Sequence, residues 1–405
     1  MTRLTKLTRR EVVGSLGAAG AAAVVSPFVG DRALAQSGDI VVGAGQPLTG
    51  IFSFAGVAMD AGLNDYCAWR NENGGVQGRK LRYVAEDTGF KLDQSVAVFK
   101  KIMASDKPNF YYCDGTPTSK AVAQDVLDAG TVMTTSTSCA SVLCDPVNMP
   151  HHFLATPTYG SMHEILMEYI SREVKGASGK PTVALVYSDT EFGRDGIPAS
   201  KARAQKLGLP IVEEIITKQA GIDVTPEVAR LRRAKPDVVI FQGYVLSPIP
   251  DFIKQMREAG LSSRAMGTIW SMDKPTYDAM GAIGEPWAGV MPYRYPYDKE
   301  SKTIATIREF VAKNRPNMAH VSIFYLHGWL SGMIFAEIAE RCIKEGKPFT
   351  LPNMKAALES IRDWDAGGMT GVTIDLSRHQ IASGRLYQYN ASNKQMEPLG
   401  DWIKV

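Results

Sequence analysis

Two short segments carry hydroxyl side chains at a spacing that suits the binding of a small anion. They are residues 116–119 (TPTS) and 134–139 (TTSTSC), and each lies between a predicted strand and a predicted helix start. Backbone N–H groups at a helix start, together with Ser and Thr hydroxyls, can hold an anion without a formal positive charge. Either segment alone could be an N-cap or a solvated loop. Because two of them occur in matching positions, we predict that they hold a ligand carboxylate.

Aromatic side chains stand after other predicted strands. Flat rings offer a large apolar area and stack on a planar partner, an interaction worth roughly 0.5 to 1.5 kcal/mol per pair beyond burial. Any one of these rings, taken alone, could equally be a core residue. We predict that four of them line one cleft: Phe54, Phe192, Tyr244 and Trp270.

These segments need a scaffold that brings strand ends together. The sequence opens with a predicted strand at 40–44, a helix at 56–69 and a second strand at 81–86. The alternation of strand and helix then repeats with little interruption, which predicts a doubly wound α/β architecture. Further strands are predicted at 110–113, 131–135, 182–187, 211–217, 237–242 and 265–268, and further helices at 93–104, 120–129, 162–174, 197–207, 226–234, 250–259, 303–314, 323–346 and 352–360.

The opening unit resembles that of the type I periplasmic binding proteins, the branched-chain amino-acid-binding family that serves ABC importers. The residues that carry the resemblance are Pro47-Leu48-Thr49-Gly50, Gly56, residues 73–78 (NGGVQG) and Glu86-Asp87-Thr88. The resemblance implies two doubly wound lobes joined by a three-stranded hinge. Lobe 1 would comprise residues 39–156 and 291–367, and lobe 2 would comprise residues 157–290 and 368–405.

The resemblance also implies a ligand site between the lobes. In the family the two hydroxyl loops grip the ligand carboxylate, and the matching positions here are Thr116, Pro117, Thr137, Ser138 and Cys139. The aromatic positions Phe192 and Tyr244 match family contacts from the other lobe, and Phe54 matches the lobe 1 aromatic that covers the ligand. Closure of the two lobes over a ligand would be the signal that a membrane partner reads.

One departure from the family concerns the ligand. Amino-acid-binding members place an acidic residue after the strand at 265–268 to bind the ligand ammonium, and this chain has Ile269 and Trp270 there. Burying an ammonium without an anionic partner costs several kcal/mol. We therefore predict a small carboxylic acid, aromatic rather than amino. Asp273 or Glu191 could replace the missing acidic residue that binds the ammonium, so an amino-acid ligand is the alternative.

The first 35 residues have the pattern of an export signal. Basic residues up to Arg10 precede a mild apolar stretch, residues 8–13 (TRREVV) resemble a twin-arginine signal, and Ala33-Leu34-Ala35 supplies a cleavage pattern. A membrane anchor is the alternative, but Gly14, Gly17, Gly20 and Pro27 interrupt the apolar stretch. We expect cleavage after Ala35 and a periplasmic protein.

The charge balance, the cysteines and the histidines limit which partners, disulfides and metal sites can be expected. Removing residues 1–35 takes away five of 45 basic and two of 42 acidic residues, so 40 of each remain, which argues against nucleic acid as a partner. Five cysteines would enter an oxidising compartment, where Cys139 and Cys144 are the best-placed pair; the alternative is five buried thiols. His151-His152 lacks partner ligands at helical spacing, so we expect no metal.

These observations together predict a binding protein. It would be a monomer without cofactor or catalytic residues that captures a small carboxylate and delivers it to ABC permease subunits in the inner membrane. A ligand sensor of the same fold is the main alternative. An enzyme is a weaker one, because the sequence shows no dinucleotide-binding spacing after Gly45, no Walker A motif and no GxSxG elbow.

Overall fold

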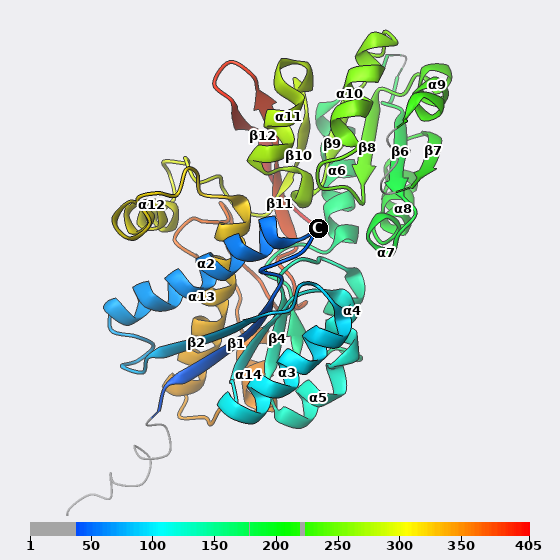
Figure 1. Ribbon diagram of the computed structural model, residues 1–405. Coiled ribbons are helices and arrows are strands. Elements are labelled where there is room, and N and C mark those ends of the chain that lie inside the picture. The colour runs from blue at the N-terminus through cyan, green and yellow to red at the C-terminus, as the bar shows by residue number, and fades with distance from the viewer. Residues whose placement is uncertain (1–37, 178, 219–222) are drawn as a thin grey trace, which may run out of the picture. The chain divides into compact units, whose positions relative to one another are not determined.

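Two largely parallel sheets organise the protein. The computed structural model describes residues 38–177, 179–218 and 223–405. One sheet has the strand order β2-β1-β3-β4-β5 and the other has the order β12-β11-β10-β9-β8-β6-β7, each with helices packed against it (Figure 1). The predicted α/β class with two doubly wound lobes is confirmed.

Lobe 1 contains the five-stranded sheet. Its strands are all parallel: β1 (Ile40–Gln46), β2 (Leu81–Asp87), β3 (Phe110–Cys113), β4 (Val132–Thr135) and β5 (His152–Phe153). One face is covered by α2 (Ser53–Glu72), α13 (Ile323–Lys344) and α14 (Leu351–Glu359), and the other by α3 (Leu92–Asp106), α4 (Thr116–Ala121) and α5 (Ala123–Ala129). In this strand order the chain reverses direction beside β1, where ligands usually bind at the carboxyl ends of the strands.

Two glycines allow α2 and α13 to pack closely. A Cβ at Gly62 would lie 2.0 Å from the carbonyl oxygen of Tyr325, and one at Gly328 would lie 2.1 Å from that of Met59. Both distances are far below van der Waals contact. The two helices therefore approach backbone to backbone, which places the start of α13 beside the start of α2.

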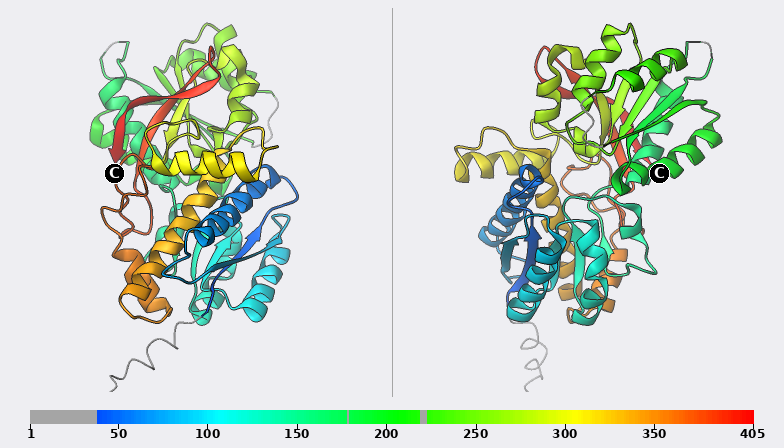
Figure 2. Two further views of the ribbon diagram at one scale, coloured as in Figure 1. Left: turned by 90° about the vertical axis from the view of Figure 1, so that its left-hand side faces the viewer. Right: turned by 45° about the vertical axis from the view of Figure 1, so that its right-hand side comes forward.

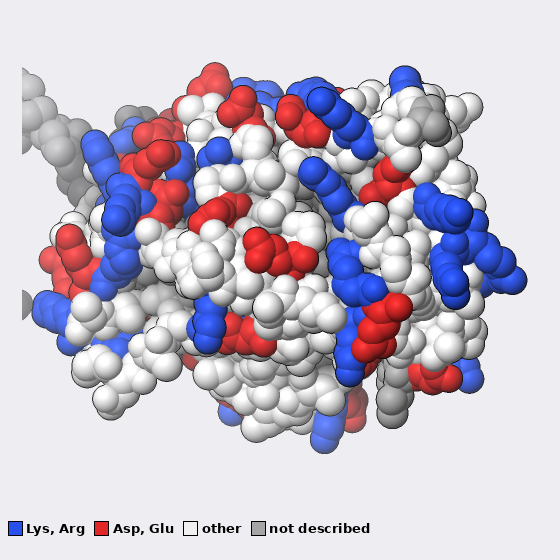
Figure 3. Space-filling model, turned by 90° about the horizontal axis from the view of Figure 1, so that it is seen from above, with Lys and Arg blue, Asp and Glu red and all other residues white. Residues whose placement is uncertain are grey.

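Lobe 2 repeats the topology and adds a hairpin. The parallel strands are β6 (Val183–Ser188), β7 (Ile211–Thr217), β8 (Val238–Gln242), β9 (Arg264–Gly267) and β10 (Ala288–Met291). The antiparallel hairpin of β11 (Ser383–Asn390) and β12 (Gln395–Lys404) extends the sheet beside β10. The helices are α6 (Tyr159–Glu173), α7 (Glu191–Arg194), α8 (Ile197–Leu207), α9 (Thr225–Ala234), α10 (Ile249–Glu258) and α11 (Lys274–Met280), with short 3₁₀ turns η2 (Ile269–Ser271) and η3 (Gly281–Gly284). Basic and acidic side chains are interspersed over the face in Figure 3.

The chain crosses between the lobes three times, at 154–158, 292–301 and 360–382, so the expected three-stranded hinge is confirmed. The third crossing hydrogen-bonds to both others: Leu154 N donates to His379 O at 2.8 Å, and Arg294 N donates to Met369 O at 2.9 Å. The exact boundaries of the lobes stay as proposed above.

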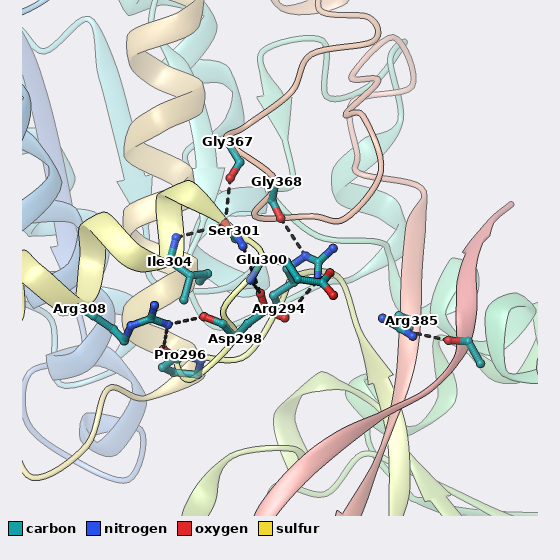
Figure 4. Close-up of polar contacts among 11 residues, drawn as sticks. Arg294, Pro296, Asp298, Glu300, Ser301, Ile304, Arg308, Gly367, Gly368 and Arg385 are labelled. Atoms are coloured by element: carbon teal, nitrogen blue, oxygen red, sulfur yellow. Dashed lines mark hydrogen bonds and ion pairs between the residues drawn. The ribbon is translucent and has the colours of Figure 1, made fainter.

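The side chain of Arg294 strengthens this hinge (Figure 4). Its Nη1 donates to Asp298 at 3.0 Å and to Glu300 at 2.6 Å, and its Nε donates to the carbonyl of Gly368 at 3.0 Å. The side chain is only 12% exposed, so these charge-assisted contacts are stronger than those of a surface pair. The contact with Gly368 joins the second crossing to the third, and the two carboxylate contacts hold the Arg294 side chain within the second crossing.

Helix α12 (Lys302–Asn314) follows the second crossing and begins with a capped first turn. Its N-cap Ser301 accepts from Ile304 N at 3.1 Å and donates to the carbonyl of Gly367 at 2.9 Å. The cap therefore ties the start of the helix to the third crossing (Figure 4).

Two helix starts differ from the prediction. Helix α2 begins at Ser53, ahead of the start predicted at residue 56, and its N-cap residue Phe52 makes no capping side-chain hydrogen bond. Residues 116–119 are the first turn of α4 rather than a loop, and the predicted helix 120–129 is divided between α4 and α5 at Val122. Pro117 in the first turn, a position that proline favours, was the missed signal.

Cys139 and Cys144, the best-placed pair, do not form a disulfide, and the alternative of free thiols holds. Both are free thiols, as are the other three cysteines, all of which lie in the described part of the chain. Cys139 Sγ lies 3.1 Å from Thr156 Oγ1, whereas Cys144 Sγ donates to the carbonyl of His379 at 3.1 Å. The two sulfur atoms thus have different partners, and both partners belong to the hinge.

Five of the six histidines are buried. His163 Nδ1 lies 3.0 Å from Ser200 Oγ, and its Nε2 lies 3.4 Å from Gln242 Oε1. Burial lowers the pKa of His163 from the ordinary 6.5 to about 4, and it lowers the pKa values of His151 and His327 to about 4 as well.

No helix within the described ranges is long and apolar enough to cross a bilayer.

These buried imidazoles make stability depend on pH. Between pH 6.5 and 4 the unfolded chain binds protons at these sites and the folded chain does not, so the free energy of unfolding falls as the pH falls through that window. From about pH 7 to 5, His163 alone should account for about 2 kcal/mol. Urea unfolding at both pH values should therefore show a smaller loss for His163→Gln than for the wild type. The exposed His320→Gln is the control; an equal loss in all three proteins would contradict the prediction.

Candidate functional site

A cavity of about 440 Å³ lies between the lobes. It is bordered by loops that follow β1, β2, β3 and β4 in lobe 1 and β6, β8 and β9 in lobe 2. Its volume is in the usual range for a small-molecule site. The lining consists of Ile51, Phe52, Phe54, Ala55, Phe90, Thr116, Pro117, Thr137, Ser138, Ala140, Tyr159, Thr190, Glu191, Phe192, Val245 and Trp270.

Seven of the nine residues predicted as site residues line this cavity. They come from both lobes: Phe54, Thr116, Pro117, Thr137, Ser138, Phe192 and Trp270. The sequence therefore located the cavity, and the binding of a ligand by these residues is a proposal taken up below.

Cys139 does not line the cavity, contrary to the prediction. Its side chain is fully buried against Thr156 of the first crossing, and burial raises the pKa of the thiol to about 12. Its carbonyl accepts a hydrogen bond from Tyr159 N at 2.8 Å. Cys139 therefore supports the wall of the cavity from behind.

Tyr244 also lies outside the lining. Gly243 has a φ of +87°, a conformation that glycine adopts readily, and the turn directs Tyr244 into lobe 2. There the Tyr244 hydroxyl lies 2.5 Å from Thr217 Oγ1. The next residue, Val245, contacts the cavity instead. The prediction chose the right loop and the wrong residue.

Hydroxyl groups from the two predicted loops meet at one end of the cavity. Thr116 Oγ1 and Ser138 Oγ lie 2.5 Å apart, and Ser138 Oγ also accepts from Ala140 N at 3.2 Å. Only one hydrogen can lie between the two hydroxyl oxygens, so the pair retains a second hydrogen for another acceptor. Thr137 differs, because its hydroxyl donates to the carbonyl of Asp114.

Aromatic rings form the other walls. Trp270 stacks on Phe324 of α13 with ring centroids 5.4 Å apart, and its Nε1 donates to the Tyr159 hydroxyl at 2.7 Å. Tyr159 in turn packs on Phe192, with centroids 5.0 Å apart. Burial raises the pKa of Tyr159 well above its usual value, so the hydroxyl stays protonated and has a hydrogen to donate. Phe52 and Phe90 pack together on the lobe 1 side, 4.4 Å apart.

Glu191 supplies the only carboxylate among these lining residues, all of which belong to the described part. It lies 2.5 Å from Lys120 Nζ of lobe 1, so its charge is balanced across the cleft. Both side chains are largely exposed, and such a pair contributes at most about 1 kcal/mol. Asp273, the other candidate for an ammonium anchor, lies elsewhere and accepts from Ser322 Oγ at 2.7 Å.

Several lining residues were not predicted from the sequence. Phe52 and Phe90 follow β1 and β2, so the rule that selected Phe54 could have found them. Tyr159 opens α6 directly after a hinge crossing and carries no strand-end signal. In the described ranges no group of three or more His, Cys, Asp or Glu side chains is arranged to hold a metal ion.

The family model and the related sequences agree on one protein family. A family model described as periplasmic binding protein matches residues 39–395. An amino acid binding protein of Pseudomonas aeruginosa is 24% identical over 229 residues, which is 56% of this chain and 60% of that protein. The Leu/Ile/Val-binding protein homolog 3 of Brucella melitensis is 23% identical over 58% of this chain and 62% of its own. The chain thus matches about three fifths of the length of these relatives.

Solved structures share the fold over nearly the whole chain. A branched-chain amino acid ABC transporter protein of Thermus thermophilus, with bound valine, superposes with a TM-score of 0.77 at 23% identity, covering 91% of this chain and 96% of its own. A solute binding protein of an ABC transporter from R. palustris, in complex with 4-hydroxybenzoate, superposes with a TM-score of 0.75 at 18% identity, covering 90% and 97%. At such identities the likeness shows a common fold.

The hydrogen bond from Trp270 to Tyr159 should support the cavity wall measurably. In Tyr159→Phe the buried indole N–H loses its acceptor, which should lower the free energy of unfolding by about 1 to 3 kcal/mol in a urea titration. Tyr187→Phe is the matched control. It removes a hydroxyl from Glu214, and that carboxylate keeps Lys201 at 2.5 Å. An equal loss in the free energy of unfolding in the two variants would show that the hydrogen bond from Trp270 stabilises the protein no more than an ordinary tyrosine contact.

Proposed function

The chain belongs to the type I periplasmic binding proteins, and from that premise we propose that it captures a small aromatic carboxylic acid and delivers it to the permease of an ABC importer. The family supplies the substrate-binding component of such transporters, and it is exported to the periplasm. Its members are binding proteins rather than enzymes, and we extend that role to this chain. We further propose that it acts as a monomer.

One observation carries the proposal: a cavity between two hinged lobes combines a cluster of hydroxyl groups at one end with aromatic walls. The hydrogen left by the pair of Thr116 and Ser138 could be donated to a carboxylate oxygen, and a charge-assisted hydrogen bond of this kind is stronger than a neutral one. The rings of Trp270 and Phe192 offer stacking surfaces to a planar ligand.

The balance of charge in the cavity favours an acid without an amino group. An amino acid needs an anion for its ammonium, and the position used in the family holds Ile269 and Trp270 here. Glu191 is already paired with Lys120, and Asp273 is held at the start of α13. The fold itself accommodates both ligand types, since its neighbours hold valine, 4-hydroxybenzoate and 3,4-dihydroxybenzoic acid. An amino-acid ligand anchored on Glu191 is the second candidate.

Polar contacts across the cleft support a role for lobe closure. Besides the pair of Lys120 and Glu191, Ser141 Oγ donates to Asp195 at 2.7 Å from the opposite lobe. Both contacts need the lobes to be close together. A ligand that bridges the lobes would add to them, and the membrane partner would recognise the closed arrangement.

The export step rests on the first 35 residues, which lie outside the described residues. Their twin-arginine-like pattern and the cleavage pattern ending at Ala35 support removal of a signal peptide on arrival in the periplasm.

The hydroxyl pair should set the affinity for a carboxylate. Using benzoate as probe, Ser138→Ala should weaken binding by about 1 kcal/mol, and by up to about 3 if the carboxylate accepts directly from this hydroxyl. Thr116→Val should act in the same direction, whereas Thr137→Val should act less because its hydroxyl faces Asp114. Calorimetry gives the affinities. The exposed Ser105→Ala is the control, and unchanged affinity in the double variant of Thr116 and Ser138 would place the carboxylate elsewhere.

The ligand class can be tested without mutation. Benzoate or cinnamate derivatives should raise the melting temperature of the mature protein more than leucine, isoleucine, valine or phenylalanine. A ligand at 100 times its dissociation constant adds about 2.7 kcal/mol of stability, which a melting curve resolves. Phenylalanine is the critical comparison because it has a ring and a carboxylate but also an ammonium. If phenylalanine or leucine gave the larger shift, the aromatic-acid proposal would be wrong and Glu191 would be the candidate anchor.

A further inference from the structure

A second cavity, of about 420 Å³, lies at the hinge and is nearly as large as the first. Its lining comes from α11, the second crossing, α12, the start of α13 and the tip of the β11–β12 hairpin. In Figure 2 this hairpin lies above α12. The residues are Asp273, Lys274, Tyr277, Tyr295, Pro296, Tyr297, Arg308, His320, Val321, Ile323, Asn393, Lys394 and Gln395.

Tyrosine rings make up much of its wall, and their positions are fixed. Tyr295 and Tyr297 stack with ring centroids 5.4 Å apart at an interplanar angle of 17°. The Tyr295 hydroxyl donates to Met272 O at 2.8 Å, and the Tyr297 hydroxyl donates to Met396 O at 2.9 Å. Because the hydroxyls are tied to the backbone, both rings are held in place; Tyr295 is buried, and the half-buried Tyr297 offers the ring surface for a flat partner.

The charge around this cavity is positive. Lys274, Arg308 and Lys394 line it together with His320, whereas the one acidic lining residue is Asp273. The Asp273 carboxylate accepts from Ser322 Oγ at 2.7 Å and from Ile323 N at 3.3 Å, so each of its oxygens already has one donor from the start of α13. Lys274 pairs with Asp278 at 2.5 Å. Arg308 donates only to backbone carbonyls, those of Pro296 and Asp298, among the hydrogen bonds of the described residues (Figure 4).

We propose that this second cavity binds a small planar organic anion of the aromatic monocarboxylate class. The half-buried tyrosine ring would stack on its plane, and Lys274, Arg308 and Lys394 would attract its charge. The site is separate from the cavity of the proposed function, and it does not depend on that function being correct.

The two cavities share a wall. Trp270 lines the first cavity and Asp273, three residues on, lines the second. On the facing lobe, Phe324 stacks on Trp270 while its neighbour Ile323 lines the second cavity and donates its N–H to Asp273. An occupant of either cavity therefore rests on the same contact between lobe 2 and α13.

The test uses 4-fluorobenzoate as probe, followed by ¹⁹F NMR and by calorimetry for stoichiometry. Wild-type protein should bind two equivalents. Reversing two rim charges in Lys274→Glu/Lys394→Glu should weaken one of them about tenfold or more and leave the other. Lys80→Glu/Lys206→Glu, which makes the same change of charge outside both linings, should bind both equivalents. The neutral analogue 4-fluorobenzamide should not occupy the second cavity, because it lacks the charge that the cations attract.

The outcomes separate this proposal from the proposed function. One equivalent or none in the wild type, or an unchanged titration in the Lys274 and Lys394 variant, overturns the second site. Thr116→Val/Ser138→Ala should lose the other equivalent and keep the one that the charge reversal removes. If that cleft variant retains both equivalents while the charge reversal removes one, the second site stands and the assignment of the first cavity fails.

Discussion

The hydrogen bonds among the three hinge crossings are the constraint on which the rest of the structure depends. Each lobe is a complete doubly wound sheet, and the crossings are the covalent connections that join one sheet to the other. The third crossing bonds to the first through His379 and Ile381, and to the second through Met369, so that all three form one ribbon. Both sets of strand ends then face the same space. The cavity follows from this alignment, because the loops after the strands have to fill the gap between the sheets.

The aromatic residues around the cavity differ in how deeply they are buried. Trp270 and Tyr159 are almost fully buried and hold each other through one hydrogen bond, whereas Phe54 is 46% exposed at the mouth. A preformed wall loses little conformational freedom when a ligand arrives, and an exposed ring gains apolar burial when the lobes approach. The two properties together favour a ligand that is flat and that reaches both lobes.

Much of the fold and seven of the sixteen residues that line the cavity could be predicted from the sequence. The alternation of apolar strands and amphipathic helices predicts the α/β class, and strand ends identify most of the loops that surround the cavity. The predictions that failed concern single residues and helix starts rather than the placement of loops. Gly243 turns Tyr244 inward, and no periodic pattern reports that turn. Helix α2 begins without a capping side chain, so its first turn carried no signal. The spacing of Cys139 and Cys144 permits a disulfide, but each thiol is directed by a hinge contact far away in the sequence. Tertiary contacts decided each of these cases.

The free cysteines have a consequence for how the protein matures. Four of the five thiols are buried, and burial raises the pKa values of Cys67 and Cys139 to about 12 and that of Cys342 to about 11. A thiol with such a pKa is almost entirely protonated at neutral pH and reacts slowly with disulfides. The fold therefore shields these thiols from disulfide exchange, and Cys144, which is only partly buried, is the cysteine with more access to solvent. The native state contains no disulfide, so the chain needs no thiol oxidation to reach it.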